Sequence, residues 1–284
     1  MRLKTSNAVE VETVIQETED TVKVFGNISF DRNETSISEF RPRLGEKGVI
    51  YGPEGVGKST WAAGSESPIF ISIEGGLKGV KPVPRIFNST KTWEDIFSHV
   101  EYLTDKEHEF KTLVVDTIDK GESMSVDYVL RQSGKKSLSG IPHGNGYVML
   151  DNEWRKLINA FDILQEKRGM NIILIGHSVV VPFKNPAGED YDRYQMLLNK
   201  RIYPMIKQWA DFMLFANHRV LVDIDEGQTK GKAISASNVI YATHSGAWDA
   251  KNRYGITEPL QMPKENGFQE FWKYVKGETK NETK

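Results

Sequence analysis

Cysteine is absent from this sequence of 284 residues, and only six histidines occur. Without cysteine the chain has no disulfide framework and no thiolate metal site, and the histidines are too scattered to suggest a structural zinc site. No apolar run is long enough to span a bilayer, and no apolar stretch typical of a secretory signal follows residues 1–4. These absences favour a cytoplasmic protein with no membrane partner.

The sequence also has no excess of one sign of charge. The formal net charge is -2, so the chain as a whole lacks the basic field typical of nucleic-acid-binding proteins. A balanced total still leaves room for a local basic groove. Hydrophobic residues make up 38% of the sequence, which is enough for one large core or two small ones.

Residues 52–59, GPEGVGKS, fit the pattern G-x-x-x-x-G-K-[ST] of a phosphate-binding P-loop. An apolar strand end, residues 49–51, precedes them, as the motif requires. Glycines let successive backbone N–H groups point at phosphate oxygens, Lys58 can reach the β- and γ-phosphates, and Ser59 can ligate Mg²⁺. We therefore predict ATP or GTP binding with Mg²⁺ through Gly52, Pro53, Glu54, Gly55, Val56, Gly57, Lys58 and Ser59.

Strand and helix patterns alternate beyond this loop. Continuous apolar strands are predicted at residues 48–51, 69–73, 112–116 and 172–176, with later strands at 212–215, 220–222 and 239–241. Helical spacing recurs at residues 93–100 and 150–164. This alternation indicates an α/β fold with a mainly parallel central sheet and helices on both faces.

Composition divides the chain into three parts. Residues 1–44 are polar, with a hairpin pattern around Gly26 and Asn27 that also suits an arm docking on a neighbouring copy. Residues 45–260 contain the predicted nucleotide-binding core. Residues 261–284 form a predicted C-terminal helix with a charged tail.

Acidic residues follow two of the predicted strands, and in a parallel sheet ligands bind at the carboxyl ends of the strands. Asp116 suits the Mg²⁺ shell, as a Walker-B acid does, although it also suits a helix cap. Glu74 can deprotonate the attacking water, although it could instead be a solvated loop acid. Thr117 follows Asp116, so no catalytic glutamate stands next to the Walker-B acid as in AAA+ ATPases. Asp119 is interpreted as a cap.

His177 ends another predicted strand. It can sense the γ-phosphate and relay its presence to the segment that follows, and the alternative is a histidine bonded to backbone. Two polar stretches, residues 133–147 and 179–198, are predicted as long loops. Both mix basic and aromatic residues, which suits single-stranded DNA, although a lid or partner-docking loop would look the same. The candidate DNA contacts are Lys135, Lys136, Lys184 and Arg193.

Lys251 and Arg253 flank Asn252 in a short basic segment. These cations could contact a phosphate, including that of a neighbouring subunit, or form a solvated turn.

The order of the motifs GPEGVGKST, IFISIEGG, TLVVDTID, IILIGHS and AKNRYG resembles that of RecA-like, core-only P-loop ATPases. Bacteriophages encode these proteins as single-strand annealing proteins or recombinases. The resemblance covers roughly residues 45–256 and implies a RecA-like fold.

The resemblance also implies roles for matched positions. Lys58, Ser59 and Thr60 would bind phosphates and Mg²⁺, with Asp116 as the Walker-B acid acting on Mg²⁺ through water. The same likeness makes Glu74 the general base and His177 the sensor coupled to the second DNA loop. It makes Lys251 and Arg253 the cationic pair that reaches the next subunit's ATP site in a ring or filament.

The leading hypothesis is an ATPase that binds single-stranded DNA, forms a homo-oligomer in the host cytoplasm, and anneals or exchanges strands. A single-strand-binding protein is a candidate partner. One alternative is a DNA motor or helicase-type ATPase. Another is a P-loop switch or small-molecule kinase without DNA. A GTPase is disfavoured because residues 199–202, NKRI, lack the aspartate of the Asn-Lys-x-Asp guanine reader.

Overall fold

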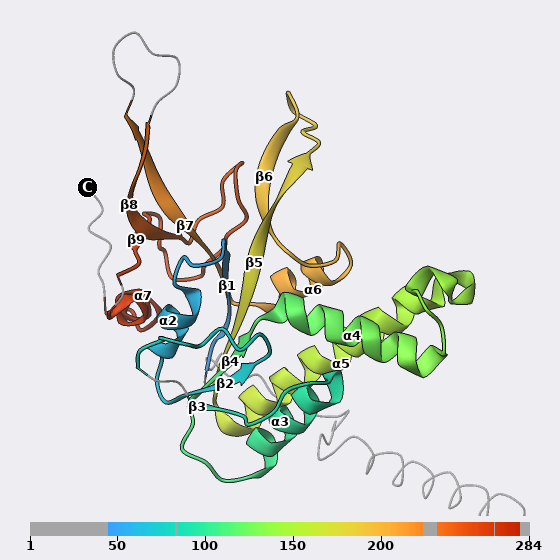
Figure 1. Cartoon of the computed structure of the whole chain (residues 1–284). Coiled ribbons are helices and arrows are strands. Elements are labelled where there is room, and N and C mark those ends of the chain that lie inside the picture. Colours follow the sequence, from blue (N-terminus) through green and yellow to red (C-terminus); the bar gives the residue numbers. More distant parts are fainter. Residues whose placement is uncertain (1–44, 83–84, 224–231, 264, 279–284) are drawn as a thin grey trace, which may run out of the picture. The chain divides into compact units, whose positions relative to one another are not determined.

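The structure is a computed structural model that describes residues 45–82, 85–223, 232–263 and 265–278 (Figure 1). The predicted arm, residues 1–44, lies outside the described residues, together with its hairpin pattern near Gly26. Among the helices described, none has both the length and the apolar character needed to cross a membrane.

A single sheet organises the described part of the chain (Figure 1). Its strand order is β3-β2-β4-β5-β1-β7-β8-β9, with β6 paired to β5. Neighbours from β3 to β7 are parallel, whereas β8, β9 and β6 pair antiparallel. The bounds are β1 Lys47–Gly52, β2 Pro68–Ser72, β3 Arg85–Ile86, β4 Thr112–Asp116, β5 Asn171–Phe183, β6 Tyr191–Met196, β7 Phe212–Asp223, β8 Lys232–Tyr241 and β9 Leu260–Gln261.

Helices cover both faces of this sheet. One core cluster joins it to α3 Trp93–Asp105, α4 Ile118–Ser133, α5 Asn145–Arg168 and α6 Ile202–Trp209. A second cluster joins the opposite face to α2 Lys58–Ala63 and α7 Gly267–Val275. Successive side chains of the central strands pack alternately into the two clusters: Val49 lies in the first cluster and Ile50 in the second. Such strands read as continuous apolar runs because both faces are buried, and the predicted α/β class is confirmed.

The sheet register aligns the carboxyl ends of four parallel strands. Asp116, the last residue of β4, pairs with Ser72 of β2 on one side and Ile175 of β5 on the other. Gly52, the last residue of β1, pairs with His177 of β5. The segments that follow these positions therefore leave the sheet at one edge.

The prediction of a long loop at residues 179–198 is wrong. β5 continues past the sheet to Phe183 and turns back as β6, so this segment is a β-hairpin. The run Val179, Val180 and Val181 carries the β-branched signal for a strand. The stretch 133–147 is also shorter as a loop than predicted, because α4 ends at Ser133, α5 begins at Asn145, and two short 3-10 turns, Leu138–Gly140 and Pro142–Gly144, lie between them. The two predicted strands at 212–215 and 220–222 are one strand, β7.

A buried carboxylate, Asp249, ties the P-loop strand to the hairpin and to α6. It accepts hydrogen bonds from Tyr203 and from Lys207 Nζ at 2.9 Å, and it forms an ion pair with Arg193 of β6 at 2.7 Å. Its backbone carbonyl accepts from the hydroxyl of Tyr51 in β1 at 2.6 Å. Burial opposes ionisation, but Lys207, Tyr203 and Arg193 outweigh it and hold the pKa of Asp249 below its ordinary value.

Replacing Asp249 by asparagine is expected to lower the free energy of unfolding by about 3 kcal/mol near pH 7, because it leaves the buried Arg193 guanidinium without its anion. The low folded-state pKa means that this stabilisation is present above the unfolded value of about 3.9 and is lost as the pH falls through the folded value. Urea denaturation of the wild type and Asp249→Asn should therefore differ at pH 7 and converge in acid. Asp192→Asn, an exposed control on β6, should behave as the wild type. Equal stability of the two variants at pH 7 would rule out a stabilising role for Asp249.

Candidate nucleotide site

The P-loop joins β1 to α2 at the carboxyl edge of the sheet. A side chain at Gly52 would meet the Ala216 carbonyl oxygen at 2.0 Å, so the loop leaves β1 where only glycine fits. Gly57 has φ +102°, a backbone conformation that favours glycine, and α2 begins at the next residue. Val56 is fully buried in the second core cluster, its carbonyl oxygen accepts from the Asn238 amide at 2.9 Å, and it does not line the pocket described below.

Lys58 is buried beneath this loop. Its Nζ donates to the carbonyl oxygens of Gly52 at 2.9 Å and Pro53 at 2.8 Å. Burial lowers the pKa of Lys58 to about 8, against the attraction of nearby acids led by Asp116. Because burial disfavours the charged form of this amine, a phosphate that enters the loop would stabilise that charge.

Ser59 and Asp116 bring together two side-chain oxygen atoms of the kind that a hard cation binds. The Ser59 hydroxyl donates to Asp116 Oδ2 at 2.7 Å. Burial raises the pKa of Asp116, and Glu74 adds to the rise, while Ser59 and Lys58 oppose it. Oxygen atoms this close together fit adjacent corners of an octahedral Mg²⁺ shell with bonds of about 2.0–2.1 Å. The residues present therefore suit Mg²⁺.

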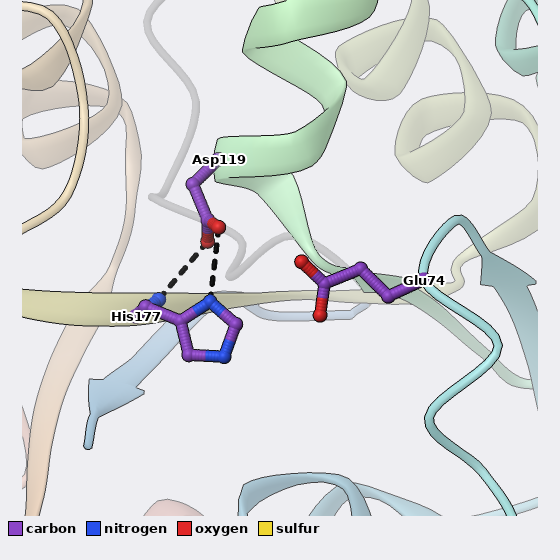
Figure 2. Close-up of side chains that lie close together, drawn as sticks. All are labelled: Glu74, Asp119 and His177. Carbon is purple, nitrogen blue, oxygen red and sulfur yellow. Dashed lines mark hydrogen bonds and ion pairs between the residues drawn. The ribbon is translucent and has the colours of Figure 1, made fainter. Parts of the chain in front are cut away.

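Glu74, Asp119 and His177 lie close together (Figure 2), and two of them, Glu74 and His177, line the same pocket as Ser59 and Asp116. Glu74 follows β2, and its Oε1 accepts from the Thr117 hydroxyl at 2.9 Å. Asp119, in the first turn of α4, accepts twice from His177: from the backbone N–H at 3.0 Å and from ring Nδ1 at 2.9 Å. The bond from Nδ1 leaves Nε2 as the ring nitrogen without a partner in this pair.

The interpretation of Asp119 as a helix cap is wrong. Thr117 occupies the N-cap position of α4, and the Asp119 carboxylate reaches across to β5. Sequence reasoning missed this partnership because β4 and β5 become neighbours only through the strand order.

One pocket collects these groups. Its lining includes Lys58, Ser59 and Thr60 from the P-loop and α2, together with Glu74, Asp116 and His177. Glu54, Gly55 and Gly57 also line it. Lys78, in the segment after β2, adds a cation that sequence reasoning did not single out. The structure therefore brings the predicted phosphate, Mg²⁺, base and sensor positions together.

Lys251 and Arg253 are not part of this pocket. The Lys251 backbone pairs with Met213, which itself pairs with Val49 in the middle of β1, and Arg253 forms an ion pair with Asp211 at 3.3 Å near the start of β7. Burial and the cations Arg253, Lys207 and Lys47 lower the pKa of Lys251, with Asp211 acting against them. These two residues point to the amino side of the sheet, away from the strand ends that form the pocket.

The four candidate DNA contacts have different environments. Lys135 and Lys136 are exposed in the connection between α4 and α5. Lys184 is exposed at the hairpin turn and forms an ion pair with Asp190. Arg193 is buried, lies over the Phe183 ring at 5.1 Å, and forms an ion pair with Asp249, so the structure speaks against it as a DNA contact.

The fold and the pocket define a P-loop nucleotide-binding protein. A sequence model of the AAA_24 family, described as an AAA domain, matches residues 44–254, and the chain belongs to this AAA-type P-loop ATPase family. No curated protein matches the chain. Among solved structures, the RadB recombinase is similar at a TM-score of 0.43 and 11% identity, covering 78% of this chain and 89% of that one. The predicted α/β class with a P-loop and a mainly parallel sheet agrees with the strand pairing described above.

Lys58→Ala is expected to weaken ATP binding about 10- to 100-fold in the presence of Mg²⁺, because hydrogen bonds to a charged group contribute about 1.5–3 kcal/mol. Calorimetric titration with a slowly hydrolysed ATP analogue measures this change. Lys120→Ala, an exposed lysine on α4 outside the pocket, is the matched control and should bind as the wild type. Equal affinity of Lys58→Ala and Lys120→Ala would show that the nucleotide binds elsewhere.

Proposed function

We propose that this AAA-type ATPase is an ATP-dependent, single-stranded-DNA-binding recombinase or annealing protein of the phage type. The observation that carries the proposal is the course of β5. This strand passes His177 beside the phosphate pocket and continues without a break to Phe183, as the first strand of the hairpin that β6 completes. A change at the γ-phosphate therefore has a direct covalent route to a projecting element.

Hydrolysis follows from the roles of the pocket residues. The nucleotide supplies the phosphoryl group and Mg²⁺ offsets its charge. Ser59 would hold the cation directly and Asp116 through water, and Lys58 would leave its carbonyl partners to neutralise phosphate oxygens. Glu74, oriented by Thr117, accepts the proton of the attacking water.

His177 serves as the sensor in this proposal, and Asp119 is its positioning residue. Two hydrogen bonds from His177 to the Asp119 carboxylate fix both the β5 backbone at this residue and the orientation of the ring. With Nδ1 bonded to Asp119, Nε2 is the atom that meets the γ-phosphate or its water. Loss of the phosphate frees this contact, and β5 transmits the change to the hairpin.

Lys251 and Arg253 act on the ATP site of a second copy in a ring or filament. Neither residue lines the chain's own pocket, which supports this role. They lie toward the amino ends of β1 and β7, whereas the pocket lies at the carboxyl ends of the parallel strands. The lowered pKa of Lys251, caused by burial and neighbouring cations, also supports it, because an anionic phosphate would relieve that repulsion.

Lys135 and Lys136 are the DNA contacts that the charge distribution favours. Both side chains are exposed and have no ion pair among the residues that the structure describes. At the hairpin, the acids Glu189, Asp190 and Asp192 offset Lys184. Backbone contact by two lysines and stacking by aromatic residues is the mode that single strands allow.

Glu74→Gln is expected to keep ATP affinity within about threefold of the wild type and to lower kcat at least 100-fold, because a general base contributes about 10²–10⁴ in rate. Thr117→Val, which removes only the bond that orients Glu74, should lower kcat by a smaller factor. Phosphate release under saturating ATP measures both variants. Full turnover in Glu74→Gln would remove this residue as the base.

Lys251→Ala and Arg253→Ala are each expected to lower ATP hydrolysis while leaving the chain's own P-loop intact. Mixing either variant with Lys58→Ala should partly restore activity, because an intact P-loop then meets an intact cationic pair at some subunit contacts. Hydrolysis by the mixture is compared with the sum of the two separate proteins. Activity no greater than that sum would argue against a shared site.

Hydrolysis measured with and without single-stranded DNA tests the proposal as a whole. Stimulation by single strands, weaker with duplex, is expected, and DNA affinity should fall with salt. In the double variant Lys135→Ala, Lys136→Ala, the slope of log affinity against log salt should fall by about 1.4, at about 0.7 per lost phosphate contact. Hydrolysis indifferent to DNA, with no retention of single strands at low salt, would instead indicate a P-loop switch or kinase.

A further inference from the structure

We propose that Glu74, Asp119 and His177 form a binding site for a transition-metal dication such as Zn²⁺, different from the Ser59–Asp116 pair, and that a metal bound there blocks ATP hydrolysis. One ligand atom from each of the three residues lies within 4.8 Å of the others (Figure 2). The separation of Asp119 Oδ2 and His177 Nδ1, 2.9 Å, is close to the spacing of adjacent ligands around a metal with bonds of about 2.0–2.1 Å.

The ligands are already oriented by hydrogen bonds on their far sides. The Thr117 hydroxyl holds Glu74 Oε1, and the His177 backbone N–H holds Asp119 Oδ1. Each carboxylate therefore has one fixed oxygen and one oxygen left for the cluster. Outer partners of this kind orient the ligands in metal sites of proteins.

The charge of the cluster favours a cation. Two carboxylates face one histidine, and in the described ranges neither carboxylate forms an ion pair with lysine or arginine. Lys58 is near enough to feel both charges, but its amine donates to backbone carbonyls. A dication between the three groups would take the place of the proton on Nδ1 that faces Asp119, and the neutral imidazole would then carry its proton on Nε2, exchanged through solvent.

The donor set selects the kind of metal. Mg²⁺ prefers oxygen ligands alone, which Ser59 and Asp116 provide, whereas one imidazole with two carboxylates suits Zn²⁺ and similar ions. Three protein ligands leave a position for water, and Glu74 and His177 line the pocket, which gives the ion a path from solvent.

Inhibition follows from the identity of the ligands and rests on the proposed function. The metal would occupy the Glu74 carboxylate that accepts the proton of water, and it would break the bond between His177 Nδ1 and Asp119 that positions the sensor ring. The P-loop and the Ser59–Asp116 pair remain free, so ATP would still bind while turnover stops. The site would therefore make the enzyme sensitive to free transition metal.

Calorimetric titration of the full chain with Zn²⁺, without nucleotide, tests the site itself. One ion per chain is expected for the wild type, and His177→Ala and Asp119→Asn should each weaken binding at least tenfold. His143→Asn, an exposed histidine in the α4–α5 connection, is the matched control and should bind as the wild type. Absence of saturable binding in the wild type, or equal affinity in His177→Ala, would overturn the proposal.

Two further measurements separate this proposal from the nucleotide proposal. Lys58→Ala should bind Zn²⁺ at least as tightly as the wild type, because it removes a cation near Glu74 and Asp119, even though its ATP affinity falls. A failure of the nucleotide proposal at the P-loop would therefore not affect the metal test. Co²⁺ bound to the wild type should show visible absorption that His177→Ala lacks, and equal spectra would contradict ligation by the imidazole. In the wild type, the Zn²⁺ concentration that halves ATP hydrolysis should match the calorimetric Kd; a mismatch beyond tenfold would refute inhibition through this site.

Discussion

The alignment of the carboxyl ends of four parallel strands is the constraint on which the site depends. Hydrogen bonding in the sheet sets Asp116 level with Ser72 and Ile175, and sets Gly52 level with His177. A shift of β5 by one residue would turn the His177 side chain to the other face. The positions of the phosphate loop and of the proposed Mg²⁺ ligands, base and sensor are thus consequences of one register, maintained by apolar strands buried on both faces.

A second constraint links this edge to the parts that project from it. Tyr51, one residue before the P-loop, bonds to the backbone of Asp249, whose carboxylate holds Arg193 of the hairpin and Lys207 of α6. The same backbone continues two residues later as Lys251. The P-loop strand, the hairpin and the cationic segment therefore share one buried polar cluster. We infer that the position of the hairpin and the position of the cationic pair are coupled.

The local patterns were sufficient to predict the central parallel strands and the P-loop, acid and histidine positions of the pocket, because each depends on near neighbours in sequence; they did not predict β6 or the place of Lys78 in the pocket lining. The P-loop spacing and the acid after residues 112–115 are such patterns. The bond between Asp119 and His177 could not be predicted, since it needs the adjacency of β4 and β5 across 58 residues. Arg193 was misjudged for the same reason: a basic residue between polar neighbours reads as exposed until Asp249, far along the chain, is placed beside it.

A crystal structure with a slowly hydrolysed ATP analogue and Mg²⁺ tests the central claim most directly. We expect the Lys58 amine to leave the Gly52 and Pro53 carbonyls for the β- and γ-phosphates. We also expect Mg²⁺ to replace the direct bond between Ser59 and Asp116, with Glu74 and His177 facing the γ-phosphate. A nucleotide bound outside the P-loop, or one bound there with Glu74 and His177 turned away from the γ-phosphate, would contradict the account.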